Sequence, residues 1–388
     1  MELLGRLEEI DAAALEPVVC RALGSETARI EEWRSEPLGG GTGAALGGGA
    51  PHRVTGSARV DGAIRHWSIV VKVLRAPEGA ANQFNQPDIG GMFYWKRDAL
   101  AYSSGLLNAL PAGFAAPRCY GIDEWDDGIR LWLEDVAEPA GKPWSLARYG
   151  EAARHLGRFN GAYLAGQPTP DQPWLCRDVL RWREPVVAPI WGRIASLDDA
   201  RVRRAWPGSL AQRALRVWNE REFFLDALER VPRVFCHGDA DRRNLFARNV
   251  ANGETETVAV DWECTGPRAV GTDVANLVFA SVLWAHDPDP ADVATLDRLG
   301  FEGYLAGLRE VGWTGPDDPV RLGYALTVAL QFGAFAGSVV VGFVDEAERP
   351  RIEAAFAGSL EDILDRHAAI QPLVLDLADE ARALLAFS

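Results

Sequence analysis

Cysteine is scarce in this chain of 388 residues and follows no recognisable pattern. The five cysteines form no C-x-x-C pair and no spacing typical of a zinc finger: Cys20, Cys119, Cys176, Cys236 and Cys264. This excludes a disulfide-stapled secreted scaffold and a structural zinc domain. We therefore expect reduced thiols in a cytoplasmic protein with an ordinary globular core, since 48% of the residues are apolar and 24% are charged.

Positive charge is also in short supply, because 40 Lys and Arg stand against 55 Asp and Glu and give a net charge of −15. Nucleic acids and anionic membranes are held by clustered Lys and Arg. We therefore expect neither as a partner. The acidic balance favours a cationic small molecule instead.

Segments suited to export or membrane insertion are few. The first residues, MELLGRLEEIDAAALEPVV, carry acids where a secretory signal has a basic region and a continuous apolar run. One uncharged stretch, residues 326–344, approaches the roughly 20 residues of a spanning helix. It contains Gln331 and lacks clustered basic flanks, so we interpret it as a buried helix, with a membrane anchor as the alternative. Gln331 would then need a polar partner or a ligand.

The sequence pattern changes near residue 134. Before it, β-rich runs occur at residues 28–33, 52–60, 67–74 and 128–136, with a helical stretch from about 93 to 107. After it, helical periodicity dominates, as at 150–166, 208–231 and 372–387. We predict an α+β protein with a small β-rich lobe, residues 1–133, and a larger helical lobe, residues 134–388.

The densest polar cluster is FCHGDADRRNLF, residues 235–246, and a hairpin is expected directly after it. Asn252-Gly253 is a strong signal for a two-residue type I′ turn. Such a turn gives the hairpin one apolar face and places Asn244 directly across from Asp261.

The spacing H-x-D-x-x-x-x-N with a later Asp is the layout of phosphoryl transfer. Asp239 would orient or deprotonate the attacking hydroxyl, while Asn244 and Asp261 would hold Mg²⁺ on the phosphates of ATP. The alternative is a polar turn in which Asp239 and Asp241 cap backbone amides. That alternative does not explain the whole set, and a calcium-binding EF-hand loop lacks its required glycine.

The β-rich lobe offers groups for a nucleotide. The glycine-rich stretch 39–49, including Gly40 and Gly41, lies between strands, where backbone N–H groups can approach phosphates; a flexible connection is the alternative. Lys72 lies in the strand WSIVVKVL on one face with Val70 and Leu74. A lysine there needs a charged partner, unless it lies on an exposed edge strand.

The expected partner of Lys72 is Asp98, because no glutamate occurs between Glu78 and Glu124. A solvated helix aspartate is the alternative for Asp98. The run LWLEDV would connect the lobes, and its backbone from Glu134 to Val136 could bind adenine, or it is an apolar strand with an acidic end.

Together these motifs resemble the aminoglycoside phosphotransferase family, relatives of choline kinase and of maltokinase-like bacterial enzymes, which share a protein-kinase-like two-lobe fold. The resemblance rests on CHGDADRRNLF and VAVDWE, and more weakly on VVKVL, KRDALAYSSGLL and LWLEDV. It implies Asp239 as the catalytic base, Asn244 and Asp261 as Mg²⁺ ligands, Lys72 as the phosphate-binding lysine and His237 as a structural brace. The resemblance also covers Gly271 and Asp273. We expect Asp273 to be a plain helix N-cap.

Some features depart from that family. Asp98 replaces the usual glutamate. Arg242 or Arg243 could contact a phosphate or the substrate, or remain solvated. DWE replaces the D-F-G of protein kinases, and no A-P-E follows. Tryptophans of the insert 174–206, near Asp198 and Asp199, could line an acceptor pocket or belong to the core: Trp174, Trp182, Trp191 and Trp206.

We therefore predict an ATP- and Mg²⁺-dependent O-phosphotransferase of a small hydroxylated acceptor, such as an aminoglycoside, an amino sugar, a sugar or an amino alcohol. The alternative is a catalytically silent nucleotide-binding or interaction protein with the same fold. The oligomeric state and the identity of the acceptor do not follow from the sequence.

Overall fold

The computed structural model describes residues 10–38, 51–76, 89–92, 94–138, 143–177, 179–193, 200–250, 253–285, 287–337, 349, 353 and 358–386. Gly40 and Gly41, and the pair Asp198 and Asp199, lie outside these residues, so their predicted roles remain predictions.

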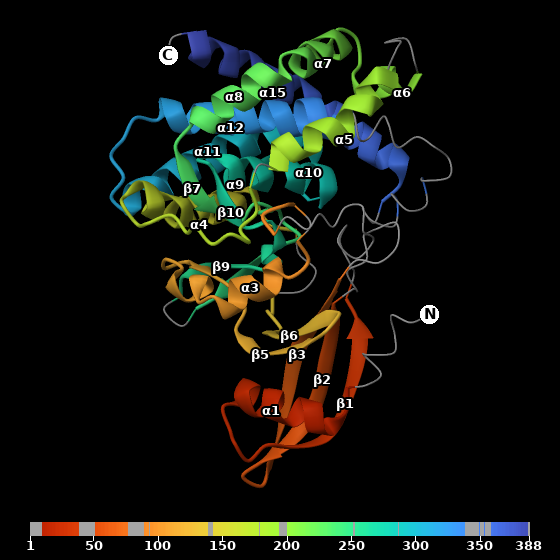
Figure 1. Ribbon diagram of the computed structural model, residues 1–388, viewed down its shortest axis with the longest axis vertical. Helices are drawn as coiled ribbons and strands as arrows, with labels where there is room; N and C mark the ends of the chain where they lie inside the picture. Colours follow the sequence, from red (N-terminus) through yellow and green to blue (C-terminus); the bar gives the residue numbers. More distant parts are fainter. Residues whose placement is uncertain are drawn as a thin grey trace.

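An antiparallel five-stranded sheet forms the smaller lobe (Figure 1). Its strands run in the order β1-β2-β3-β6-β5: β1 (Arg29–Pro37), β2 (His52–Val60), β3 (Ala63–Arg75), β6 (Gly128–Glu134) and β5 (Cys119–Trp125). Helix α1 (Ala12–Leu23) packs on one face and helix α3 (Arg97–Ser103) on the other. The sequence predicted four of these strands and missed β5.

The two faces of β3 follow the predicted alternation. Trp67, Ile69 and Val71 join the apolar cluster beneath α1. On the opposite face, Leu74 packs with Ala99 of α3. Because side chains alternate along a strand, Lys72 shares the face of Leu74 and points to α3. The predicted helix at 93–107 is shorter in the structure, where α3 ends at Ser103 and a 3₁₀ turn, Leu106–Ala109, follows the left-handed Gly105 (φ 81°).

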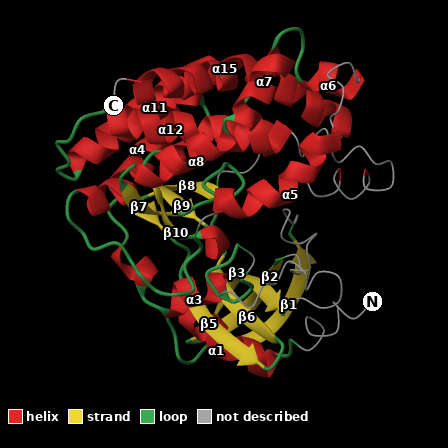
Figure 2. Ribbon diagram, turned by 45° about the horizontal axis from the view of Figure 1, so that its top comes forward, coloured by secondary structure: helices red, strands yellow, loops and turns green. Residues whose placement is uncertain are grey.

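The larger lobe is mainly helical (Figures 1 and 2). Its main helices are α4 (Leu146–Leu164), α5 (Val179–Arg193), α6 (Ala200–Ala205), α7 (Leu210–Asn219), α8 (Arg221–Arg230), α9 (Thr272–Ala275), α10 (Ser281–Trp284), α11 (Val293–Glu310), α12 (Asp318–Val328) and α15 (Leu360–Ala386). The two-lobe α+β fold predicted from the sequence is confirmed. We propose Glu134, the last residue of β6, as the boundary between the lobes.

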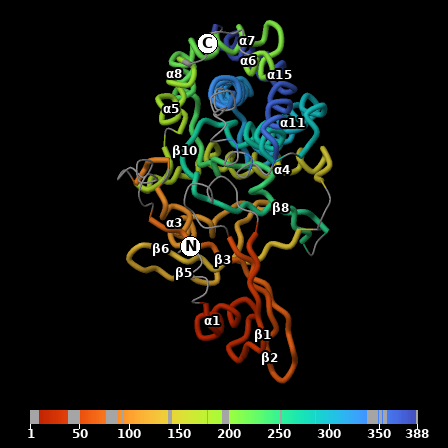
Figure 3. Tube along the Cα trace, turned by 90° about the vertical axis from the view of Figure 1, so that its right-hand side faces the viewer, coloured from red at the N-terminus to blue at the C-terminus, as the bar shows by residue number. Residues whose placement is uncertain are grey.

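Two small sheets in the larger lobe position the polar cluster. Strand β7 (Arg233–Cys236) pairs with β10 (Gly266–Ala269), and β8 (Leu245–Asn249) pairs with β9 (Thr255–Ala259). Strand β4 (Phe114–Ala115) adds to β9 in parallel, so a short segment from before residue 134 belongs to this second region. The chain trace places the β8 region between the five-stranded sheet and the helices (Figure 3).

The apolar stretch that begins at Leu326 is buried in the helical lobe as far as it is described. It continues α12 into a π-helical segment, Ala329–Phe335. Gln331 finds the polar partner that its burial demands, because its Nε2 donates to Asn276 Oδ1 (2.8 Å). None of the described helices is long and apolar enough to cross a membrane.

Candidate active site

The loop between β7 and β8, residues 237–244, is held by a buried carboxylate. The backbone N–H groups of His237 and Gly238 each donate to Asp273, over 2.9 Å. Asp273 is fully buried and also accepts from Asn160 Nδ2 (3.1 Å). The predicted N-cap role of Asp273 is wrong, because Gly271 occupies that position of α9. Asp273 fixes the backbone that carries Asp239.

Gly238 is required by its backbone and by its neighbours. Its φ of 86° lies in the left-handed region that glycine adopts without strain. A Cβ atom at this position would lie 2.3 Å from the carbonyl oxygen of Cys264 and 2.9 Å from Nε of Arg268. The glycine of the HGD motif therefore lets β10 and the residues before it approach the loop closely.

His237 braces the loop, which agrees with its predicted structural role. Its Nε2 lies 2.9 Å from the carbonyl oxygen of Val260, which can only accept, so Nε2 carries the proton. Nδ1 then accepts the N–H of Asp239 (3.3 Å). The ring also packs edge-on against Trp262, with centroids 4.8 Å apart.

The predicted register of the following hairpin is wrong by one residue. Leu245 pairs with Ala259, and the Val250 N–H donates to the Glu254 carbonyl (3.0 Å), so three residues connect the strands instead of two. Asn244 consequently faces Val260, and the Val260 N–H donates to the Asn244 carbonyl (2.9 Å). Asp261 comes one residue later, with a left-handed backbone (φ 64°) that interrupts the extended conformation.

Asp239 and Asn244 are nevertheless in direct contact. Nδ2 of Asn244 donates to the backbone oxygen and to Oδ2 of Asp239, both at 2.9 Å. Burial, and next the charge of Asp241, raise the pKa of Asp239 to about 6. The charge of Asp261 acts in the same direction, which indicates that this carboxylate is also near. The three predicted polar residues are thus gathered at one place.

Lys72 joins the two lobes through two carboxylates. Its Nζ lies 2.8 Å from Asp98 Oδ2 and 2.6 Å from Asp261 Oδ1. Burial opposes the ammonium charge, but the charges of Asp261 and Asp98 outweigh it and hold the pKa of Lys72 well above its ordinary value. The structure therefore forms the predicted Lys72–Asp98 pair, although the side chain is one methylene shorter than the usual glutamate.

Lys72→Met is expected to lower kcat/KM for ATP by about 10²- to 10³-fold, the effect of removing one preorganised donor to developing charge. The substitution also leaves Asp98 and Asp261 without their shared cation. Steady-state kinetics with varied ATP would measure the effect. The control is Lys96→Met, directly before α3, where the ammonium pairs with the exposed Glu124 (2.6 Å). Equal losses in both variants would contradict a special role for Lys72.

Oxygen atoms suited to a magnesium ion remain free beside Asp239. No hydrogen bond within the described residues engages Asn244 Oδ1 or Asp261 Oδ2. Amide and carboxylate oxygens are the donors that Mg²⁺ prefers, and the ion usually keeps several waters. The described residues contain no group of three His, Cys, Asp or Glu side chains that could hold a metal. The two oxygen donors therefore fit a hydrated Mg²⁺.

Glu263 of the DWE motif is a further acid in this region, and it was not predicted from the sequence. The charge of Asp261, followed by burial, raises the pKa of Glu263 to about 8. Its neighbour Arg97 was missed as well. Arg97 is fully buried at the start of α3 and donates to the Glu263 carbonyl (2.7 Å). Its only sequence signal is its position directly before Asp98.

Glu134 of the predicted adenine site and the two arginines of the polar cluster form ion pairs within the protein. Glu134 pairs with Arg248 (2.9 Å), and its own N–H donates to the Arg118 carbonyl (2.8 Å), so that N–H is not available to adenine. Val136 is half-buried just beyond the end of β6. Neither arginine of the polar cluster is solvated, because Arg243 pairs with Asp241 and Arg242 with Glu138, which lies 2.7 Å away.

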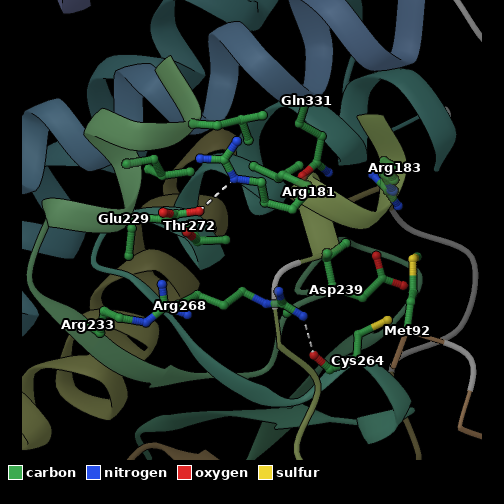
Figure 4. Close-up of a pocket in the computed structure, with 16 residues that line it drawn as sticks. Met92, Arg181, Arg183, Glu229, Arg233, Asp239, Cys264, Arg268, Thr272 and Gln331 are labelled. Atoms are coloured by element: carbon green, nitrogen blue, oxygen red, sulfur yellow. Dashed lines mark hydrogen bonds and ion pairs between the residues drawn. The ribbon is translucent and has the colours of Figure 1, made fainter. Parts of the chain in front are cut away.

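A cavity of about 710 Å³, including its opening to solvent, lies directly beside Asp239 (Figure 4). Its walls come from α5, α8, β10 and the loop, and Gln331 lines it. None of the four insert tryptophans is among the lining residues. Trp191 and Trp206 are core residues instead, and Trp191 stacks on Trp218 at 5.4 Å.

The arrangement of lobes, loop and lysine defines the class of the protein: a two-lobe kinase-like fold. The profile of the "Phosphotransferase enzyme family" matches residues 100–311, which is more than half of the chain. The chain belongs to this family of phosphotransferases.

Solved structures agree with the fold. An aminoglycoside phosphotransferase from Alicyclobacillus acidocaldarius is 13% identical, with a TM-score of 0.51 over 91% of this chain and 93% of that one. A choline kinase from Cryptosporidium parvum is also 13% identical, with a TM-score of 0.50 over 95% of this chain and 96% of that one. No curated protein sequence matches the chain significantly. The structural similarities support the fold alone.

Proposed function

We propose that the protein transfers the γ-phosphoryl group of ATP to a hydroxyl group of a small molecule. The observation that carries this proposal is the contact of Asp239 with Asn244 beside the Lys72–Asp261 pair, at the mouth of a cavity. The family membership supports phosphoryl transfer, and the cavity lies directly beside Asp239, where an acceptor hydroxyl would have to be placed.

The residues of the chain act by positioning and by charge. Asp239 orients the acceptor hydroxyl and accepts its proton as the new O–P bond forms and the bond to the leaving ADP breaks. Lys72 binds phosphate oxygens of the nucleotide, and Asp98 fixes the direction of its ammonium group. Asn244 and Asp261 would hold Mg²⁺, which neutralises phosphate charge when bound.

The test is ADP formation from ATP in the presence of aminoglycosides, amino sugars, neutral sugars, sugar acids and amino alcohols. We expect acceptor-dependent ADP formation that stops when EDTA removes Mg²⁺. Phosphorus NMR of the product should show a phosphate monoester on oxygen.

The second candidate is a catalytically inactive nucleotide-binding protein. The observation that favours it is Asp98, whose side chain is one methylene shorter than the usual glutamate. It would bind an ATP analogue but form no ADP with any acceptor. Loss of nucleotide binding as well would contradict the kinase proposal.

A further inference from the structure

The cavity beside Asp239 is lined by more positive than negative charge. Four arginines reach it and only two acids do: Arg181, Arg183, Arg233 and Arg268, against Glu229 and Asp239. In Figure 4, Arg183 and Gln331 lie on one side of Asp239, and Arg268 with Cys264 on the other. The acceptor hydroxyl must enter this same space to reach Asp239.

Two of these four arginines offer little charge to a bound molecule, Arg181 because it is already paired with acids and Arg233 because it is exposed. Arg181 pairs with Glu229 (2.7 Å) and also with Glu222 (2.6 Å) on α8, so its charge is cancelled locally. Arg233 is exposed and donates to the Pro267 carbonyl (2.6 Å). The charge available to a bound molecule therefore comes from Arg183 and Arg268.

Arg268 is a buried cation with an unused donor. Its side chain belongs to β10, and the residue is only 8% exposed. Nη2 donates to the Cys264 carbonyl (2.6 Å), while Nε is buried without any hydrogen-bond partner. The guanidinium lies against Gly238, the residue directly before Asp239. No hydrogen bond within the described residues engages Nη1, and Arg268 lines the cavity, so Nη1 is the donor of this guanidinium that is available to a bound molecule.

Arg183 is the second free cation. Within the described residues its side chain forms neither a hydrogen bond nor an ion pair. Burial lowers the pKa of its guanidinium, and the charge of Asp239 acts in the opposite direction, which indicates that the two groups are near each other. Guanidinium groups bind carboxylate and phosphate oxygens through two parallel hydrogen bonds.

We propose that the acceptor carries an anionic oxygen group, a carboxylate or a phosphate, which Arg183 and Arg268 bind while its hydroxyl faces Asp239. This proposal rests on the proposed kinase function and names the class of its substrate.

The acidic net charge of the chain does not decide this preference. The expectation of a cationic acceptor came from the charge of −15 alone. Charges on the surface are screened over about 8–10 Å at physiological salt, whereas partly buried groups are screened much less. The two arginines at the cavity therefore outweigh a distant excess of surface carboxylates.

The experiment compares hexoses that differ in charge: glucosamine, glucose, glucuronate and glucose 6-phosphate. Calorimetry would measure their binding to the full chain with Mg²⁺ and a non-hydrolysable ATP analogue. The variants are Arg183→Gln and Arg268→Lys, which keeps the charge of the more deeply buried side chain. The control is Arg230→Gln, on the exposed end of α8 and outside the cavity.

We expect glucuronate or glucose 6-phosphate to bind at least about tenfold more tightly than glucosamine, the scale of a charge-assisted hydrogen bond. Arg183→Gln should remove this advantage, so that the anions bind no more tightly than glucose does. Arg268→Lys should retain part of the advantage and Arg230→Gln all of it. The difference between the two anions then identifies carboxylate or phosphate.

Three outcomes would overturn the proposal: tighter binding of glucosamine, no binding of either anion, or a loss in Arg183→Gln that falls on the ATP analogue alone. In that last case the arginines serve the nucleotide. ADP formation with glucosamine would keep the kinase proposal and reject the anionic acceptor. Binding of an anion without ADP formation from any acceptor would reject the kinase proposal and keep the binding of an anionic molecule by the two arginines.

Discussion

Asp239→Asn is expected to lower kcat by about 10²- to 10⁴-fold, the usual contribution of a positioned general base. An amide cannot take the proton of the acceptor hydroxyl. Its oxygen can still accept the hydrogen bond from Asn244 Nδ2, which now spans 2.9 Å. The loop geometry should therefore survive, so we expect unchanged affinity for an ATP analogue and an unchanged thermal denaturation curve.

The contrast with Asp273→Asn separates catalysis from positioning. Asp273 contacts no reacting group but accepts two backbone N–H groups of the loop. Its amide variant should lower thermal stability together with kcat, whereas Asp239→Asn lowers kcat alone. Single-turnover kinetics and calorimetric melting would be measured on both variants. A wild-type kcat in Asp239→Asn would show that another group receives the proton.

The part of the site that the sequence predicted correctly depends on local alternation and on simple elimination. The period of two in WSIVVKVL places Lys72 opposite the buried Trp67, Ile69 and Val71, as the structure has it. No glutamate lies between Glu78 and Glu124, so Asp98 of the following helix was the available partner. Both inferences need only neighbouring residues, which is why they succeeded.

The hairpin register could not be predicted because the same dipeptide serves two loop lengths. Asn-Gly fits a two-residue type I′ turn, but a left-handed glycine also closes a three-residue loop. Gly253 has φ of 82° and its N–H donates to the Val250 carbonyl (3.0 Å), as in the longer loop. The one-residue shift moves Asp261 out of the ladder, and its left-handed backbone supplies the turn toward Lys72.

The two arginines proposed to bind the acceptor, Arg183 and Arg268, were also not predicted from the sequence. The half-buried Arg183 and the buried Arg268 have no sequence signal that distinguishes them from solvated arginines, because α5, α8 and β10 form the cavity wall only in the folded chain. Long-range packing of this kind leaves no periodic trace in the sequence.

Arg97→Met is expected to lower the free energy of unfolding by about 3–5 kcal/mol, the range for breaking a buried charged network. Arg97 donates to five backbone carbonyls, those of Ile89, Gly91, Met92, Trp174 and Glu263. Methionine replaces only the aliphatic part of the arginine side chain and has no donor, so these carbonyls lose their partner. Urea denaturation would measure the change. Lys96→Met is the matched control, expected to cost at most about 1 kcal/mol because its ion pair is at the surface.

Arg97→Met also tests the contact between α3 of the smaller lobe and the DWE motif of the larger lobe. Arg97 and Asp98 are consecutive in α3 and contact consecutive residues of the DWE motif, since the Trp262 N–H donates to Asp98 Oδ1 (3.1 Å) and Arg97 reaches the Glu263 carbonyl. Arg97→Lys keeps the charge with fewer donors and should show an intermediate loss. Equal stability of Arg97→Met and Lys96→Met would mean that apolar packing replaces the buried guanidinium at no net cost. α3 would then be held to the DWE motif through Asp98 alone.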